Sequence, residues 1–544
     1  MSQLPFAITL DPGTSLANQT GSWRTLKPVY LDRLPPCNNA CPAGENIQNW
    51  LFHAEEGDYF TAWQKLMEDN PMPGVMGRVC YHPCETACNR AELDEAVGIH
   101  AIERFLGRKA WEEKWVPEFT ARPSGKRVLV IGAGPSGLSA AYHLTRLGHS
   151  VTIRDAGPMA GGMMRFGIPK YRLPRDVLDY EIQRIIDMGV DLQLNIKVDD
   201  IDAAFTSEGF DAVFVAVGAH IAKRINIPAH SACKILDAVT VLRDIETEAE
   251  IPQLGRRVIV YGGGNTAMDV ARTAKRLGVE EPMIVYRRSR NEMPAHDFEA
   301  TEAEEEGVMI HWLRTIKQID ETTFTVEKMA IDKEGRPQPT GEFETFEADT
   351  LILALGQDVD TSFLQSVPGI EVASDGVVQV DQGMMTGRAG VFAGGDMVPA
   401  ERTVTVAVGH GKKAARNIDA WLRGQSYDAP QKPELADVSS LNTWYYDDAP
   451  QSRQAELELA RRQSGFDEVV MGLTEDNALF EARRCLSCGN CFECDNCYGI
   501  CPDNAVTKLG PGNRFAFKYD YCKGCGMCAT ECPCGAIKMV AEEI

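Results

Sequence analysis

The sequence predicts an α/β chain of several domains, in which two Rossmann-like dinucleotide-binding domains lie between two cysteine-rich ends. Three observations lead to this prediction. At 544 residues, the chain is longer than one hydrophobic core usually serves. Two glycine-rich turns follow apolar strands in its middle. All but one of its 17 cysteines lie near one end or the other.

Composition excludes several classes of protein. The net charge of -23 argues against a surface that binds nucleic acid or an anionic membrane. The first residues lack the basic start and apolar run of a secretory signal, and no later run approaches the roughly 20 apolar residues that span a bilayer. We therefore expect a cytoplasmic protein. Because thiols stay reduced in the cytoplasm, the cysteines need a role other than disulfides.

The N-terminal segment combines cysteines with amphipathic stretches. Five cysteines lie between Cys37 and Cys88, and apolar residues recur at helical spacing from Asn46 to Pro71. This spacing predicts helices that bury one face. We therefore expect an N-terminal α-helical Fe-S domain whose helices pack around the first clusters.

The first dinucleotide fingerprint follows an apolar strand at 127–131. Its first glycine makes the tight turn, its second lets the backbone approach a pyrophosphate, and its third lets helix and strand pack closely. About 20 residues further on, the next strand ends in an acid that would bind a ribose hydroxyl. An ordinary glycine turn would not need this whole pattern. The predicted binding residues are Gly132, Gly134, Pro135, Ser136, Gly137 and Asp155.

A second fingerprint follows the strand at 258–261. Its predicted binding residues are Gly262, Gly264, Asn265, Thr266 and Ala267. The next strand of this unit ends in Arg287 and Arg288 instead of an acid, which suits the 2'-phosphate of NADP better than NAD. The alternative is that both arginines belong to a solvated loop.

Two cysteine runs near the C-terminus have the C-x2-C-x2-C-x3-C-P spacing of bacterial ferredoxins. In two-cluster ferredoxins, the fourth cysteine of each run ligates the other cluster. Zinc is the alternative, but zinc sites usually separate two cysteine pairs by about a dozen or more residues. We therefore expect a C-terminal bacterial-type ferredoxin domain with two [4Fe-4S] clusters. One would bind Cys491, Cys494, Cys497 and Cys532, and the other Cys522, Cys525, Cys528 and Cys501.

Four longer motifs resemble one group of flavoproteins. They are GGMMRFGIPKYRLP (161–174), GGGNTAMD (262–269), VYRRSRNEMPA (285–295) and FAGGDMVPAERTVTVAVGHGKKAA (392–415). From about residue 37 to about residue 422, the chain resembles the small subunit of NADPH-dependent glutamate synthase. The flavoprotein half of dihydropyrimidine dehydrogenase and bifurcating ferredoxin:NADP oxidoreductases share the pattern.

The resemblance implies FAD at the first fingerprint and NADPH at the second. It also implies that Asp396 bonds the ribityl chain of the flavin and that a helix starting near Thr403 points its N-terminus at the isoalloxazine. Such a helix terminus would stabilise an anionic reduced flavin. Because hydride passes directly between nicotinamide and flavin, no catalytic acid or base is predicted. The further predicted binding residues are Gly162, Arg165, Gly218, Gly356, Gly395, Val404 and Thr405.

The resemblance also suggests ligands for the N-terminal clusters. The family opens with an RCxxCG pair that is missing ahead of Cys37, whereas EARRCLSCG occurs far downstream. We therefore expect Cys485 and Cys488, from the same or a neighbouring chain, to join Cys37 and Cys88 in one cluster. The second would use Cys41, Cys80 and Cys84, with Glu103 as a fourth, non-cysteine ligand. The competing interpretation is one cluster from four of the five local cysteines, with Cys485 and Cys488 structural.

These motifs divide the chain. The predicted domains are a helical [4Fe-4S] domain at 1–120, an FAD domain at 121–235 and 352–423, an NADPH domain at 236–351, a linker and helix at 424–484, and the ferredoxin domain at 485–544. Cys233 and Cys534 fit no cluster and are assigned no role.

The expected function is electron transfer. Hydride would move between NADP(H) and FAD, and single electrons would move through [4Fe-4S] clusters to or from ferredoxin or a larger low-potential oxidoreductase subunit. This prediction implies a hetero-oligomer. The alternatives are the small subunit of a true glutamate synthase and a non-catalytic Fe-S scaffold or redox sensor.

Overall fold

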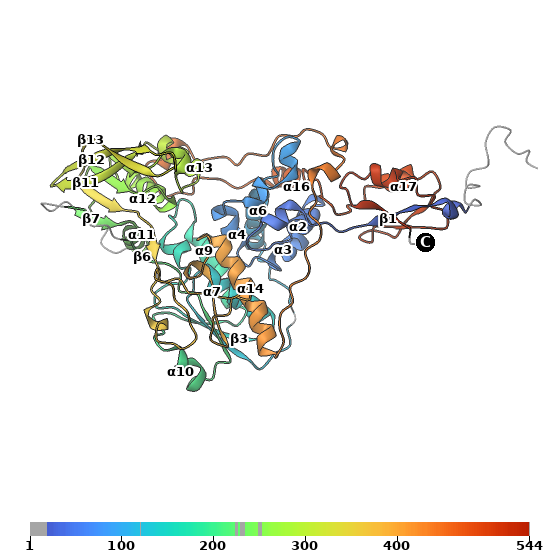
Figure 1. Cartoon of the computed structure of the whole chain (residues 1–544), viewed down its shortest axis with the longest axis horizontal. Helices are drawn as coiled ribbons and strands as arrows, with labels where there is room; N and C mark the ends of the chain where they lie inside the picture. The colour runs from blue at the N-terminus through green and yellow to red at the C-terminus, as the bar shows by residue number, and fades with distance from the viewer. Residues whose placement is uncertain (1–18, 120, 224–226, 229–233, 248–252, 543–544) are drawn as a thin grey trace, which may run out of the picture.

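The computed structural model describes residues 19–119, 121–223, 227–228, 234–247 and 253–542. Figure 1 shows a helical domain at the centre of the molecule, one nucleotide-binding sheet to its upper left, the other below it, and the C-terminal cysteine-rich module at the right. Within these ranges, no helix is long and apolar enough to cross a membrane. Cys233 lies outside the described residues.

The central domain is helical because its apolar residues recur every three or four positions. Its helices are α1 (Pro36–Ala40), α2 (Ile47–Glu55), α3 (Tyr59–Met67), α4 (Pro73–Val79), α5 (Pro83–Thr86) and α6 (Ile99–Glu112). Trp50 and Trp63 are fully buried in its core. Truncating a buried tryptophan typically costs about 3–5 kcal/mol of stability, so these side chains fix the framework that holds the cysteines.

The first fingerprint belongs to a parallel five-stranded sheet with the order β16-β5-β2-β3-β4. Its strands are β2 (Arg127–Ile131), β3 (Ser150–Arg154), β4 (Asp191–Gln193), β5 (Ala212–Val215) and β16 (Val391–Ala393). The chain enters α7 (Pro135–Arg146) directly after β2, and α7 packs against the long helix α14 (Val404–Leu422). The remaining helices of this domain are α8 (Met163–Phe166), α9 (Arg175–Ile186) and α10 (Ile201–Thr206).

The second fingerprint belongs to another parallel sheet, with the order β10-β9-β8-β14-β7. Its strands are β7 (Lys234–Asp237), β8 (Arg257–Tyr261), β9 (Glu281–Tyr286), β10 (Met309–Trp312) and β14 (Thr350–Leu353). Helices α11 (Ala238–Glu246), α12 (Asn265–Arg276) and α13 (Asp297–Glu305) and an antiparallel sheet of β11 (Arg314–Asp320), β12 (Thr323–Ile331) and β13 (Pro337–Glu347) complete it. The short strands β6 (Ile221–Ala222) and β15 (Gln357–Asp358) pair where the chain enters and leaves this inserted domain. Its sheet therefore extends slightly beyond the predicted limits of 236 and 351.

The C-terminal module contains α17 (Asn496–Ile500), β17 (Val506–Lys508), β18 (Phe515–Phe517), α18 (Met527–Thr530) and β19 (Ile537–Ala541). Its last strand pairs in antiparallel fashion with β1 (Leu26–Tyr30), from the opposite end of the chain. An unpaired edge strand exposes its backbone N–H and C=O groups, and β1 satisfies those of β19. The predicted boundary at 120 placed this strand with the helical domain, whereas in the structure it is part of the C-terminal module.

Residues 424–484, predicted as a linker and a helix, contain two short α-helices. These are α15 (Leu459–Arg462) and α16 (Glu475–Ala482). Arg462 forms ion pairs with Glu306 of the second nucleotide domain, and Glu468 contacts Arg78 of the helical domain. The segment thus fastens the helical domain to the nucleotide-binding domain on its way to the C-terminal module.

Candidate functional site

The first glycine turn has room for a phosphate group. A side chain at Gly137 would place its Cβ 1.9 Å from the Gly132 carbonyl oxygen, so only glycine fits there. Beside Gly134, by contrast, the nearest atom to such a Cβ is 3.9 Å away. Helix α7 starts without a side-chain cap, and the buried Ser136 hydroxyl has no hydrogen-bond partner among the described residues. Free N–H groups and an unpartnered hydroxyl at a helix N-terminus fit an anionic ligand.

Two further groups converge on this turn. Asp155 accepts hydrogen bonds from the backbone N–H groups of Ala133 (2.7 Å) and Gly157 (2.7 Å), so its carboxylate holds the turn in place. A Cβ on Gly395 would lie 3.2 Å from the Ser136 Cβ, which brings Asp396 to the same end of the sheet. The Asp396 carboxylate accepts no hydrogen bond from the part of the chain that the structure describes. Burial raises the pKa of Asp396 to about 6, and Arg402 partly offsets this. A half-buried carboxylate that lacks a protein donor fits a ligand that has hydroxyl groups.

Arg165, predicted to bind the cofactor, contacts other residues of the protein. Its guanidinium donates to the Ala160 carbonyl oxygen (2.6 Å) and forms an ion pair with Asp179. These contacts engage the side chain with the protein itself. Gly162 approaches the backbone of Gly134 closely, while Gly218 and Gly356 both have positive φ and open surroundings.

The second glycine turn has the same open geometry as the first, but it has positively charged side chains nearby. A Cβ on Gly262 would lie 2.2 Å from the Ala354 carbonyl oxygen, and Gly264 has nothing within 4 Å. Helix α12 also starts without a side-chain cap. Beyond β9, Arg287 is exposed and Arg288 half-buried, and neither forms an ion pair with a described residue. Two cations without acidic partners fit an additional phosphate.

Tyr81, which was not predicted from the sequence, links the helical domain to this second turn. The Asn265 side chain donates a hydrogen bond to the Tyr81 hydroxyl at 2.6 Å, and the Tyr81 ring stacks on His296 with centroids 3.7 Å apart. Its neighbour Cys80 was predicted as a ligand, but no pattern marks the tyrosine itself. The helical domain therefore touches the predicted NADP-binding turn directly.

One set of four thiols lies at the junction of the helical domain and the residues that follow α16. Cys37, Cys88, Cys485 and Cys488 line a single small cavity. Burial, followed by the nearby thiols of Cys485, Cys88 and Cys488, raises the pKa of Cys37. The four thiols come from one chain, so no neighbouring chain is needed to bring them together. Partly buried, clustered thiols without disulfides fit a [4Fe-4S] cluster.

A buried arginine places the two distant cysteines. Arg484, which directly precedes Cys485, is 2% exposed. Its guanidinium donates to the Ala96 carbonyl oxygen (3.0 Å) and the Glu95 carbonyl oxygen (2.6 Å) of the helical domain. In return, Arg90 donates to the Arg484 carbonyl oxygen (2.8 Å). This exchange of hydrogen bonds fixes the chain where it meets the first cysteines.

The second set combines three thiols with two carboxylates. Burial raises the pKa of Cys84, and its thiol neighbours are Cys80 and Cys41. Burial raises the pKa of Glu103 as well, with contributions from Glu45 and Cys80. The three cysteines and Glu103 therefore share one region in which each group affects the charge of the others.

Glu45 is a member of this site that was not predicted. Asn70 donates hydrogen bonds to both carboxylates, at 3.0 Å to Glu45 and 2.6 Å to Glu103. Burial and then the nearby Asp69 raise the pKa of Glu45 to about 7. The only signal in the sequence is an acid four residues after Cys41 that precedes an apolar helix.

The C-terminal module forms two further groups of thiols. The thiol neighbours of Cys497 are Cys491, Cys494 and Cys532, and those of Cys528 are Cys522, Cys497, Cys501 and Cys525. Each fourth cysteine thus lies with the opposite run, as in two-cluster ferredoxins. Cys494 and Cys525 are exposed, one in each group. Cys534 is buried, with its Sγ 3.8 Å from that of Cys532.

The four groups follow one another through the molecule. Thr405, in the first turn of α14, donates a hydrogen bond to the Met76 sulfur (3.7 Å) and lies near enough to Cys80 to oppose the rise in the pKa of its thiol, so the predicted flavin helix adjoins the site with the carboxylates. Cys37 lies in helix α1 and Cys41 directly follows that helix, and the two belong to different groups. Cys488 precedes Cys491 of the C-terminal module by three residues, and the Gly489 N–H between them donates to the Cys534 carbonyl oxygen (2.7 Å).

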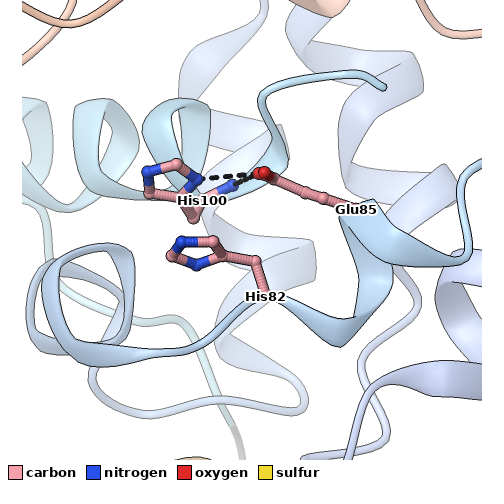
Figure 2. A group of neighbouring side chains, drawn as sticks. All are labelled: His82, Glu85 and His100. Carbon is pink, nitrogen blue, oxygen red and sulfur yellow. Dashed lines mark hydrogen bonds and ion pairs between the residues drawn. The ribbon is translucent and has the colours of Figure 1, made fainter. Parts of the chain in front are cut away.

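Figure 2 shows a trio near these sites, His82, Glu85 and His100, whose ligand atoms lie within 4.8 Å of one another. The two imidazole rings are stacked, with centroids 3.8 Å apart and an interplanar angle of 10°. Imidazole lone pairs lie in the ring plane, so two parallel rings do not converge on one ion. His100 already contacts Glu85 through Nδ1 (2.8 Å) and Gln454 through Nε2 (3.0 Å). The trio therefore packs α5 against α6.

Three family models match the chain. The model described as pyridine nucleotide-disulphide oxidoreductase matches residues 126–411, which is more than half of the chain. Dihydropyrimidine dehydrogenase domain II, 4Fe-4S cluster, matches 32–115, and the 4Fe-4S binding domain matches 516–538.

Curated relatives cover most of the chain. NADP(+)-dependent formate dehydrogenase subunit beta of Moorella thermoacetica is 38% identical and covers 83% of this chain and 70% of its own length. NADPH-Fe(3+) oxidoreductase subunit beta of Geobacter sulfurreducens is 34% identical, with 84% and 76% covered. The small chain of glutamate synthase [NADPH] of Escherichia coli is 32% identical, with 71% and 89% covered.

Proposed function

Because the chain belongs to the pyridine nucleotide-disulphide oxidoreductase family, we propose that it relays electrons between NADP(H) and a partner protein through FAD and four [4Fe-4S] clusters. It is an FAD-dependent, NADP(H)-linked oxidoreductase with [4Fe-4S] domains. When bound, FAD exchanges hydride with the nicotinamide and single electrons with the clusters. We further propose the order of the redox centres, the ligands of each cluster and the partner protein.

The observation that carries the proposal is the meeting of Cys485 and Cys488 with Cys37 and Cys88. This four-thiol site lies between the cysteine-rich module and the flavoprotein half, so it would link the thiol groups of the two regions. The path would run from the flavin helix to the site of Cys41, Cys80, Cys84 and Glu103, then to the four-thiol site, and then into the module. Cys494 and Cys525 would bring electrons to the surface.

The chain's own residues would prepare the two nucleotide sites. The uncapped N-termini of α7 and α12 would each bind a pyrophosphate, with Ser136 as an additional donor at the first. Arg287 and Arg288 would bind the 2'-phosphate of NADP. Asp396 would accept hydrogen bonds from flavin hydroxyl groups, and the first turn of α14 would stabilise negative charge on the flavin.

The partner is proposed from the relatives. All three are named as subunits or chains of larger enzymes, so we infer a hetero-oligomer. The formate dehydrogenase subunit covers more of this chain (83%) than the glutamate synthase chain does (71%). We therefore favour a low-potential oxidoreductase subunit or ferredoxin as the partner over a glutamate synthase. A cytoplasmic location stays a prediction.

Rapid mixing tests the relay. The anaerobic, fully loaded chain is mixed with NADPH or NADH, and flavin bleaching and then cluster reduction are followed. We expect faster bleaching with NADPH, followed by cluster reduction, and about sixteen irons per chain. About twelve irons would reduce the proposal to three clusters, and no bleaching with either nucleotide would favour a scaffold.

A further inference from the structure

The N-terminal strand places a tyrosine against the cysteines of the C-terminal module. Tyr30 pairs with Ile537 in the β1–β19 ladder, and the next residue continues the pairing through Leu31 N–H to the Ala536 carbonyl oxygen (2.9 Å). The Tyr30 ring stacks on Phe517, with centroids 5.0 Å apart and an interplanar angle of 21°. Backbone pairing and ring stacking together fix the direction of this side chain.

The Tyr30 hydroxyl lies 3.3 Å from the Sγ of Cys497. A metal-bound cysteine is a thiolate without a proton, so in the loaded protein the tyrosine must be the donor. Cys491 and Cys532, two other thiols of the same group, also lie near the hydroxyl. Tyr30 therefore faces three of the four proposed ligands of one cluster.

We propose that Tyr30 donates a hydrogen bond to the ligating sulfur of Cys497 and thereby raises the reduction potential of the cluster on Cys491, Cys494, Cys497 and Cys532. Reduction adds negative charge to the cluster, and a donor to a ligand sulfur stabilises that charge. The inference rests on the proposed ligand assignment.

This tuning has a consequence for electron flow. In chain order, the tuned cluster follows the four-thiol site, since Cys491 comes three residues after Cys488. A more positive potential there favours electron movement from the helical domain into the module. The strand that completes the module's edge thus also adjusts its first redox centre.

The test is a potentiometric titration of the full-length chain loaded with FAD and clusters, monitored by electron paramagnetic resonance at pH 7. We expect Tyr30→Phe to move one cluster's midpoint potential to a more negative value and to leave the others in place. The matched control is Tyr519→Phe. Tyr519 donates to the Pro28 carbonyl oxygen (2.9 Å) and so holds the same strand without bonding to a sulfur. It should show no shift.

Iron content distinguishes a failure of the proposed ligands from a failure of the proposed role of Tyr30. A wild-type chain that lacks iron in the module contradicts the proposed ligands and the proposed function with them. Full iron with identical potentials in wild type and Tyr30→Phe overturns the role of Tyr30 alone, as does an equal shift in Tyr519→Phe. If Tyr30→Phe loses iron, a chain with 3-fluorotyrosine at position 30 is titrated in place of that variant. Its stronger donor should shift the potential positively, and an unchanged potential overturns the inference.

Discussion

The helical domain and the C-terminal module hold similar cysteine groups in opposite ways. The module draws all eight predicted ligands from residues 491–532, whereas the helical domain combines residues 37–103 with Cys485 and Cys488. None of the described cysteines of the helical sites is exposed, but each group in the module has one exposed thiol, Cys494 or Cys525. One of the two helical sites also includes the carboxylates of Glu45 and Glu103, whereas the predicted ligands of the module are cysteines alone.

This difference separates two tasks. A centre without an exposed ligand is suited to pass electrons to its neighbours within the protein. A centre with an exposed ligand can exchange electrons with another protein. The helical domain is therefore suited to an internal relay and the module to exchange at the surface. Changes in the helical domain should interrupt the path, while changes in the module should alter its exit.

Removing a ligand of the four-thiol site should have the largest effect. We expect Cys488→Ala to lower the iron content by about four per chain. NADPH should still bleach the flavin, but reduction of the module clusters should no longer follow, because the relay is broken upstream of them. Iron analysis combined with rapid mixing measures both effects.

Cys534→Ala is the matched control for this variant. Cys534 is buried beside Cys532 but belongs to neither predicted ligand set. Its substitution should leave the iron content unchanged. Full iron in Cys488→Ala would place Cys488 among the structural cysteines, in agreement with the competing single-cluster interpretation.

The difference between the two regions also explains which of their features could be predicted from the sequence. The module was predictable because its ligands recur at fixed local spacings, and the two glycine turns because a fingerprint combines strand, turn and helix. The pairing of Cys485 with Cys37 rested on a family resemblance, since no local pattern joins residues so far apart. Glu45, Tyr81 and the β1–β19 pairing were not predicted, because only the folded chain brings their partners together.

A smaller effect is expected from the carboxylates of the other helical site. Glu103→Ala should change the electron paramagnetic resonance spectrum of one cluster and leave the other three intact. Glu45→Ala should preserve that spectrum, since Glu45 is not assigned as a ligand. The opposite result, with a changed spectrum only in Glu45→Ala, would make Glu45 the fourth ligand.

The preference for NADPH over NADH tests the proposed nucleotide site, where electrons enter the relay. Replacing both Arg287 and Arg288 by alanine should weaken NADPH binding by about 1.5–3 kcal/mol, roughly ten- to a hundredfold, because charged hydrogen bonds to the 2'-phosphate are lost. NADH binding should hardly change. Equilibrium titrations of both nucleotides measure the ratio. Arg290→Ala is the control, since Arg290 is already paired with Asp297 and Glu304. An unchanged ratio in the double variant would return both arginines to a solvated loop.

The smallest effect concerns the attachment of β1 to the module. Arg24 forms a two-point ion pair with Glu542, with both contacts at 2.7 Å, and also donates to the Cys522 carbonyl oxygen (3.0 Å). In Arg24→Ala, the β1–β19 amides should exchange hydrogen for deuterium up to several times faster, because the ladder opens more often once its end is released. Lys508→Ala, which removes an ion pair with Asp495 elsewhere on the module, should leave that exchange unchanged. Iron content should stay constant in both variants, since neither touches a thiol. Equal exchange in wild type and Arg24→Ala would show that backbone pairing, the Tyr30 ring and Tyr519 hold the strand without Arg24, and would strengthen the case that Tyr30 is fixed against Cys497.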